Sequence, residues 1–256
     1  MKIATWNVNS LKVRLPQVLD WLQTEQPDVL ALQEIKMRDA DFPAQIFLEA
    51  GYHAYSAGQK TYNGVALLTR DQSLENVITE LSTDEDPQRR VLTASWKDYR
   101  IINLYVPNGE ALDSPKYQYK LNWLKNCRAF LTTELQQHSK IVVLGDFNIA
   151  PNDLDVCDPK TWQNSVLVSA AERAVFQDFL ELGFVDIFRH VMPDVQEFSW
   201  WDYRAASFRR NLGLRIDHIL VSPALRPNCQ RCWIDKKIRG LERPSDHAPV
   251  VAEFVD

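Results

Sequence analysis

Short continuous apolar runs alternate along the chain with longer stretches in which apolar residues recur at helical spacing. The short runs are rich in Val, Ile and aromatic residues, which fit the pleated surface of a buried strand. These predicted strands are KIATW, VLALQ, GVALLT, VLTASW, RIINLYV, KIVVLG, RIDHILVS and PVVAEF. Leu and Val at helical spacing predict one helix around positions 15–22 and a longer one around positions 121–135.

The segment SAAERAVFQDFLELG predicts a third helix with both ends marked. Ser169 and Glu172 have the spacing of a capping box, in which each side chain accepts a hydrogen bond from the other residue's backbone N–H. Apolar residues at positions 175, 176, 179 and 180 would form the buried face. Gly183 then favours a helix end, because glycine readily adopts the left-handed conformation found there.

The order of these elements favours two packed sheets with helices outside over a doubly wound nucleotide-binding fold. Strands and helices alternate unevenly, and toward the C-terminus strands follow one another with little helix between them. The segment APNDLDVCDPKTW predicts a long surface loop rather than a domain boundary. Because no low-complexity linker, composition break or internal repeat is visible, we expect a single domain over residues 1–256.

Composition is typical of a soluble globular protein, with 45% hydrophobic and 25% charged residues. The net charge of −5 argues against a protein that coats DNA, but allows an enzyme with a local basic groove around an acidic metal site. The N-terminal sequence lacks a signal-peptide pattern, and no run approaches the ~18 apolar residues of a membrane span. Only Cys229 and Cys232 form a CxxC pair, so we expect reduced thiols in a cytoplasmic protein.

Carboxylate and amide side chains recur in or at the ends of the predicted strands. They are Asn7, Glu34, Asn108, Asp146, Asn148, Asp217 and Asp246, and Asp246 directly precedes His247. Each residue taken alone fits a turn cap. Burying several carboxylates costs several kcal/mol unless something compensates, and a hard divalent cation suits a set of oxygen ligands. No His and Cys set has zinc-site spacing.

Taken together, the motifs resemble the bacterial exonuclease III family, the Mg²⁺-dependent DNA-repair branch of the endonuclease/exonuclease/phosphatase superfamily. The resemblance extends from Lys2 to Phe254 through WNVNS, LQEIK, YNGVALLTR, QRR, LYVPNGE, GDFNIAP, SWWDYR, LGLRIDHILVS and RPSDHAPV. It implies a four-layered α/β sandwich, in which two packed mixed β-sheets are flanked by helices. It also implies a monomeric hydrolase that acts on double-stranded DNA at abasic sites, nicks and blocked 3′ ends, without a membrane.

The resemblance implies a metal site around Glu34, the central ligand. Asn7 and Asp246 would lie in the same environment, together with Asp146 and Asn148. Mg²⁺ suits such a set because it takes one or two carboxylates, keeps several waters and accepts a substrate phosphate. Mn²⁺ would substitute for it.

The resemblance divides the catalytic roles between an aspartate–histidine pair and the groups around the attacking water. Asp217 would hold His247 in its charged form, as a donor to a non-bridging phosphate oxygen. The alternative is a buried histidine satisfied by a carboxylate without catalysis. Asp146 would orient and deprotonate the attacking water and Asn148 would hold water and phosphate, although the identity of the proton acceptor stays open. The remaining donors to the phosphate would be Tyr105 and Asn108.

The same resemblance implies contacts with the DNA backbone and a pocket for an extrahelical sugar or a 3′ terminus. The backbone contacts would be Arg89, Arg90, Lys120 and Arg209, although basic clusters are more often solvated faces. Trp200 would lie by the pocket, with Leu214 in its apolar wall, while at least one neighbouring aromatic residue packs in the core. Leu167 is a candidate for restricting access to an internal abasic site.

Two other functions fit parts of this pattern. A superfamily phosphoesterase acting on inositol phosphates or phospholipids would share Glu34, Asp146, Asn148, Asp217 and His247, but would not need the wedge aromatics. A non-catalytic DNA-binding or scaffold protein on the same fold would have lost at least one site residue. DNA binding would distinguish a repair enzyme from the phosphoesterase, and Mg²⁺-dependent cleavage would distinguish it from the non-catalytic protein.

Overall fold

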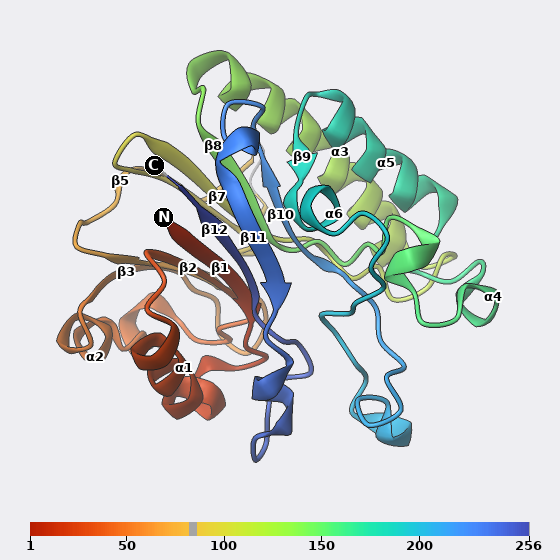
Figure 1. Ribbon diagram of the computed structural model, residues 1–256, viewed down its shortest axis with the longest axis horizontal. Helices are drawn as coiled ribbons and strands as arrows, with labels where there is room; N and C mark the ends of the chain where they lie inside the picture. Colours follow the sequence, from red (N-terminus) through yellow and green to blue (C-terminus); the bar gives the residue numbers. More distant parts are fainter. Residues whose placement is uncertain (82–85, 256) are drawn as a thin grey trace.

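Two mixed six-stranded β-sheets pack face to face in the computed structural model, which describes residues 1–81 and 86–255 (Figure 1). The first sheet has the order β11 (Cys229–Ile234), β12 (Val250–Phe254), β1 (Lys2–Asn7), β2 (Val29–Gln33), β4 (Val65–Arg70) and β3 (Tyr52–Ala57). The second has the order β5 (Glu75–Ile78), β6 (Val91–Trp96), β7 (Tyr99–Tyr105), β8 (Ile141–Asp146), β10 (Asp217–Val221) and β9 (Val185–Asp186).

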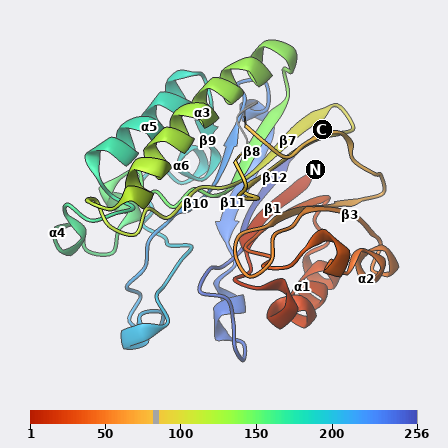
Figure 2. The same ribbon diagram turned by 180° about the vertical axis from the view of Figure 1, so that it is seen from behind.

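Helices cover both outer faces of this pair of sheets, so the predicted four-layered sandwich is confirmed (Figure 2). The first sheet is covered by α1 (Leu11–Glu25) and α2 (Ala44–Glu49), and the second by α3 (Pro115–Gln137) and α5 (Ala170–Glu181). Two shorter helices are α4 (Pro159–Trp162) and α6 (Ile187–Val191). Short 3₁₀ segments span Asp39–Asp41, Asp153–Asp155, Arg204–Ala206, Arg226–Asn228 and Lys236–Gly240. No helix among the described residues is both long and apolar enough to span a membrane.

The central strands are buried on both faces, which explains why the sequence shows them as continuous apolar runs. In β1, Ile3 packs into the core between the two sheets, whereas Ala4 and Trp6 pack under α1. In β8, Leu144 faces the same inter-sheet core and Val143 packs under α3 and α5. Strands covered on both faces lose the alternation of apolar and polar residues that marks a half-exposed strand.

All eight predicted strands are present, and the predicted capping box of α5 is confirmed, since the side chains of Ser169 and Glu172 each accept the other's backbone N–H. The strands that the pattern did not predict are β3, β5, β9 and β11. All four are edge strands that are short or partly exposed, so their apolar runs are interrupted.

The register of the strands brings their polar ends to one rim. The parallel pair β1 and β2 ends together at Asn7 and Gln33, immediately before Glu34. On the second sheet, Tyr105 of β7 pairs with Asp146 of β8, and Asp146 pairs with Asp217 at the start of antiparallel β10. The C-terminal ends of β1, β2, β7 and β8 and the N-terminal end of β10 therefore lie at the same rim.

Candidate active site

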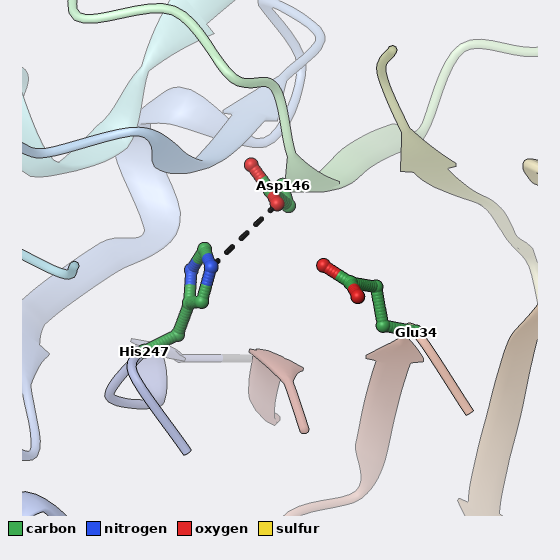
Figure 3. Close-up of side chains that lie close together, drawn as sticks. All are labelled: Glu34, Asp146 and His247. Carbon is green, nitrogen blue, oxygen red and sulfur yellow. Dashed lines mark ion pairs between the residues drawn. The ribbon is translucent and has the colours of Figure 1, made fainter. Parts of the chain in front are cut away.

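Three side chains from different strand ends converge at this rim. Glu34, Asp146 and His247 each offer an atom suited to bind a metal, and these atoms lie within 4.8 Å of one another (Figure 3). Asp146 and His247 are buried, whereas Glu34 keeps 18% of its side-chain surface exposed. The cluster therefore opens to solvent on the Glu34 side, from which an ion or a phosphate can enter.

Asn7 lies between the two carboxylates of this cluster. Its Nδ2 donates to Glu34 Oε1 and to Asp146 Oδ2, both at 2.9 Å, while its Oδ1 accepts the backbone N–H of Asn9. An amide oxygen turned toward two carboxylates would be repelled by them, so the donor orientation fits the charges. In this arrangement Asn7 spaces the two carboxylates, and its role as a metal ligand stays a prediction.

Glu34 is held at the rim in an unusual backbone conformation. Its φ of 52° lies in the left-handed region, which is uncommon for a residue other than glycine and is often found at functional sites. The conformation is fixed on both sides, because Ser10 N donates to the Glu34 carbonyl and Ile35 N donates to that of Gly64.

Lys36 is a site residue that the sequence reasoning missed. Its Nζ lies 2.8 Å from Glu34 Oε2 and donates to Asn9 Oδ1 at 2.6 Å. Its position two residues after Glu34, within LQEIK, was the available signal. The ammonium provides a positive charge beside the carboxylate that was predicted to hold the cation.

The predicted pairing of His247 with Asp217 is present in the structure. His247 Nδ1 lies 2.9 Å from Asp217 Oδ2, which also accepts a hydrogen bond from Ser199 Oγ at 2.6 Å. His247 Nε2 faces Asp146 Oδ2 at 3.8 Å. Burial alone would lower the pKa of His247, but the negative charges of Asp217 and Asp146 outweigh the effect of burial and raise the pKa to about 10. The ring is therefore a charged donor whose Nε2 points into the cluster.

Asp146 has the electrostatics of a base. Burial raises the pKa of Asp146 to about 7, with the charge of His247 acting in the opposite direction. The carboxylate is fixed by Asn7 Nδ2 and by the backbone N–H of Asn148, which donates to Oδ1 at 2.9 Å. A general base is most effective when its pKa lies near the working pH.

Tyr105, Asn108 and Asn148 line the same rim. Burial raises the pKa of Tyr105, and the charges of Glu34 and Asp146 raise it further, so the phenol stays protonated as a donor. Asn108 Nδ2 donates to Asn148 Oδ1 at 3.1 Å, and Asn148 Nδ2 donates to the Val106 carbonyl. The structure thus brings together the side chains that were predicted to hold water and phosphate.

Asp246 lies beside this cluster rather than in it. Its two oxygens accept hydrogen bonds from Asn9 Nδ2 at 2.9 Å and Trp200 Nε1 at 3.0 Å. It connects to Glu34 through Asn9 and Lys36. Both of its oxygens accept hydrogen bonds in this arrangement, and its role as a metal ligand stays a prediction.

Two of the predicted DNA contacts are wrong because their side chains have no exposed surface. Lys120 is fully buried and forms an ion pair with Glu172. Leu214 is also fully buried and packs in an apolar cluster behind Trp200, so it forms no exposed wall of a pocket. Leu167, the candidate gate, packs in the same cluster and is 4% exposed.

The other predicted DNA contacts lie on or near the surface. Arg209 is exposed, and Arg89 is partly exposed and paired with Glu80. Arg90 is mostly buried, with its guanidinium 4.7 Å from the centroid of the Tyr105 ring. Trp200 is partly exposed beside His247, while the neighbouring Phe198 and Trp201 are buried in the core as expected for at least one of them.

A cavity of about 660 Å³ opens next to Tyr105 and Asn108. Arg90 and Lys116 contribute positive charge to its lining, and Tyr62 contributes an aromatic ring that is 67% exposed. Sequence reasoning did not single out Tyr62, although the aromatic residue within YNGVALLTR was the available signal.

Comparison with known proteins identifies the family of this chain. The model of the Endonuclease/Exonuclease/phosphatase family matches residues 4–247. Exodeoxyribonuclease III of Haemophilus influenzae is 39% identical over 267 residues, with 99% of this chain and 100% of the relative covered. The 3′ phosphatase NExo from Neisseria, solved with a product DNA hairpin, has a TM-score of 0.98 at 50% identity, with 100% of both chains covered. An AP endonuclease from Archaeoglobus fulgidus has a TM-score of 0.96 at 40% identity, again over 100% of both chains.

The family match covers nearly the whole chain, and the relatives are similar to it from end to end. Together with the convergence of Glu34, Asp146 and His247 at one rim, these matches show that the chain belongs to the endonuclease/exonuclease/phosphatase family.

Proposed function

We propose that this protein is a metal-dependent DNA-repair nuclease of the exonuclease III type. Its substrates would be double-stranded DNA with blocked 3′ ends, nicks or abasic sites. The observation that carries the proposal is the cluster of Glu34, Asp146 and His247, in which a buried base faces a charged donor beside an exposed carboxylate. The relatives support this substrate class, since they are named as an exodeoxyribonuclease, a 3′ phosphatase bound to DNA and an AP endonuclease.

The residues present fit a hard divalent cation, and we propose Mg²⁺. Glu34 and Asp146 would hold it, because both are oxygen donors and Glu34 is open to solvent. His247 is a poor ligand, since its Nδ1 is paired with Asp217 and its raised pKa keeps the ring protonated. When bound, the cation would polarise a phosphoryl oxygen and offset charge on the leaving oxygen.

The protein's own groups would carry out the rest of the hydrolysis. Asp146 accepts a proton from water as the water oxygen attacks phosphorus and the bond to the leaving oxygen breaks. His247 and Tyr105 donate hydrogen bonds to the phosphate oxygens, where negative charge develops. The amides of Asn108 and Asn148 orient the water and the phosphate. Such a step requires no covalent nucleophile, because positioning and electrostatic stabilisation suffice.

The groove beside Tyr105 supports DNA as the substrate over a small phosphoester. Arg90, Lys116 and Tyr62 line the cavity beside the cluster, where two cations suit the phosphates of a DNA backbone and the aromatic ring suits a base or sugar ring. An enzyme for inositol phosphates or phospholipids has no need of these additional contacts.

We expect the enzyme to work as a single-domain monomer in the cytoplasm, where its DNA lies.

One cleavage assay with three labelled duplexes tests the proposal. The duplexes carry an internal abasic-site analogue, a 3′-phosphate at a nick, and a plain recessed 3′ end, each with Mg²⁺ or with EDTA. Cleavage that needs Mg²⁺ supports the proposal, and the relative rates identify the preferred substrate. Absence of cleavage on every duplex refutes a DNA nuclease, and DNA binding without cleavage would favour a scaffold protein.

A further inference from the structure

A fully buried ion pair lies directly behind the site. Lys120 of α3 donates from Nζ to Glu172 Oε1 of α5 at 2.5 Å, and neither side chain has exposed surface. Removing two charges from water is costly, and well-packed apolar residues of similar volume often give equal or greater stability. The pair therefore suggests a role other than stability.

The other hydrogen bonds of Lys120 go to the two site asparagines. Its Nζ donates to the Asn148 carbonyl at 2.6 Å and to the Asn108 carbonyl at 3.1 Å. These residues follow β8 and β7 respectively, and their side chains contact each other through Asn108 Nδ2 and Asn148 Oδ1. Asn148 has a left-handed φ of 49°, a conformation that asparagine adopts more readily than most other residues.

The hydrogen bonds of Glu172 go to a third segment of the rim. Its carboxylate accepts the backbone N–H groups of Leu167 and Ser169, each at 3.0 Å, and the Ser169 hydroxyl at 2.6 Å. Leu167 has a φ of 78°, and its carbonyl accepts the backbone N–H of Ala150. Because Leu167 packs in the apolar cluster behind Trp200, the carboxylate fixes the backbone on that side of the site.

We propose that Lys120 and Glu172 are positioning residues for phosphate hydrolysis. Lys120 holds Asn108 and Asn148 in one arrangement, and Glu172 ties that arrangement to the segment at Leu167. The pair touches neither substrate nor metal, so its effect on the reaction passes through the two asparagines. This inference rests on the proposed function for the chemistry of the site, but the arrangement itself can be measured without activity.

The chain offers a matched control for a test of this role. Arg100 of β7 and Glu134 of α3 form another buried ion pair, with Nε and Oε2 2.6 Å apart and exposures of 3% and 5%. Arg100 also donates to the Asn76 carbonyl at 2.8 Å and to Ser95 Oγ at 3.3 Å, away from the rim. Lys120→Met and Arg100→Met therefore remove comparable charges, only one of which is linked to the site.

The experiment measures steady-state kinetics on the 3′-phosphate duplex together with thermal unfolding. Lys120→Met should lower kcat about 10- to 100-fold, as expected for a small misplacement of catalytic groups, with KM changed less than about threefold. Arg100→Met should lose stability but keep its kcat. In the double variant K120M/E172Q neither charge is left unpaired, so stability should recover relative to Lys120→Met while kcat stays low.

Three results would overturn the inference: equal kcat for the Lys120→Met and Arg100→Met variants, full recovery of kcat in K120M/E172Q, or a change confined to KM. The last would mean that the buried pair affects substrate binding rather than the chemical step. Side-chain amide resonances of Asn108 and Asn148 give a second readout. They should shift in Lys120→Met and not in Arg100→Met, and unshifted resonances would contradict the positioning role. An inactive wild-type enzyme would refute the proposed function alone, because these resonances still test the arrangement.

Discussion

Replacing Asp217 with Asn tests how the protein charges and orients His247. In the wild type, Asp217 Oδ2 lies 2.9 Å from His247 Nδ1 and is itself fixed by Ser199. The carboxylates around the ring raise its pKa from 6.5 to about 10 against the opposing effect of burial. At about 1.4 kcal/mol per pKa unit, the environment favours the charged ring by several kcal/mol.

Asp217→Asn removes the nearest of these charges, so His247 loses much of its protonation and its fixed orientation. Removal of one preorganised donor to a developing oxyanion costs about 10²- to 10³-fold in kcat. We therefore expect a kcat loss of this size on the 3′-phosphate duplex, with KM changed little because ground-state binding relies on other contacts. The assay is steady-state cleavage at saturating Mg²⁺, with thermal unfolding measured in parallel.

Glu134→Gln is the matched control, because it neutralises another buried carboxylate that pairs with a cation away from the rim. It should lose stability and keep kcat. A kcat for Asp217→Asn within about threefold of wild type would refute the reasoning, as would equal kcat losses in the two variants. His247 would then be a buried histidine satisfied by a carboxylate, without a part in catalysis.

Three further predictions concern the metal, the DNA and pH. Glu34→Gln should weaken Mg²⁺ binding at least about tenfold by calorimetry, because the open carboxylate is lost, and wild-type turnover at low Mg²⁺ would contradict its role. Arg209→Ala should reduce the salt dependence of DNA binding by about one unit of log–log slope, and an unchanged slope would exclude a phosphate contact. Burial and the charge of Arg215 lower the pKa of His218 to about 4, so the unfolded chain binds a proton near pH 6.5 that the folded chain excludes at this residue. Between pH 7 and pH 5 in urea titrations, this residue should cost wild-type protein up to about 2 kcal/mol that a His218→Gln variant does not lose, and equal changes in the two proteins would refute this.

The sequence predicted the layers and most of the site because both depend on local patterns. Strands covered on both faces appear as continuous apolar runs, and the polar residue that ends each run marks the rim. The residues around Asp146 in GDFN and around His247 in SDH were identified in this way. The edge strands β3 and β11 were missed because half-exposed positions interrupt their apolar pattern.

The errors concern the direction and burial of individual side chains. Lys120 has the sequence neighbours of a surface lysine, yet a carboxylate from a separate helix, Glu172, makes its complete burial possible. Leu214 is covered by Trp200, a contact between separate segments that spacing does not reveal. The direction of the Asn7 amide likewise depends on Glu34 and Asp146, two carboxylates from other strands that its nitrogen contacts. Each outcome depends on partners distant in sequence.

The most direct test of the central claim is the single-turnover rate of 3′-phosphate removal from a nicked duplex in Mg²⁺, for wild-type protein and Asp146→Asn. DNA affinity is measured for both proteins in parallel. If Asp146 is the base, the variant should lose at least about 10²-fold in rate, at the lower end expected for loss of a general base, while its Kd stays within about threefold of wild type. A parallel loss of rate and affinity, or a rate that does not change, would contradict the assignment of hydrolysis to this cluster.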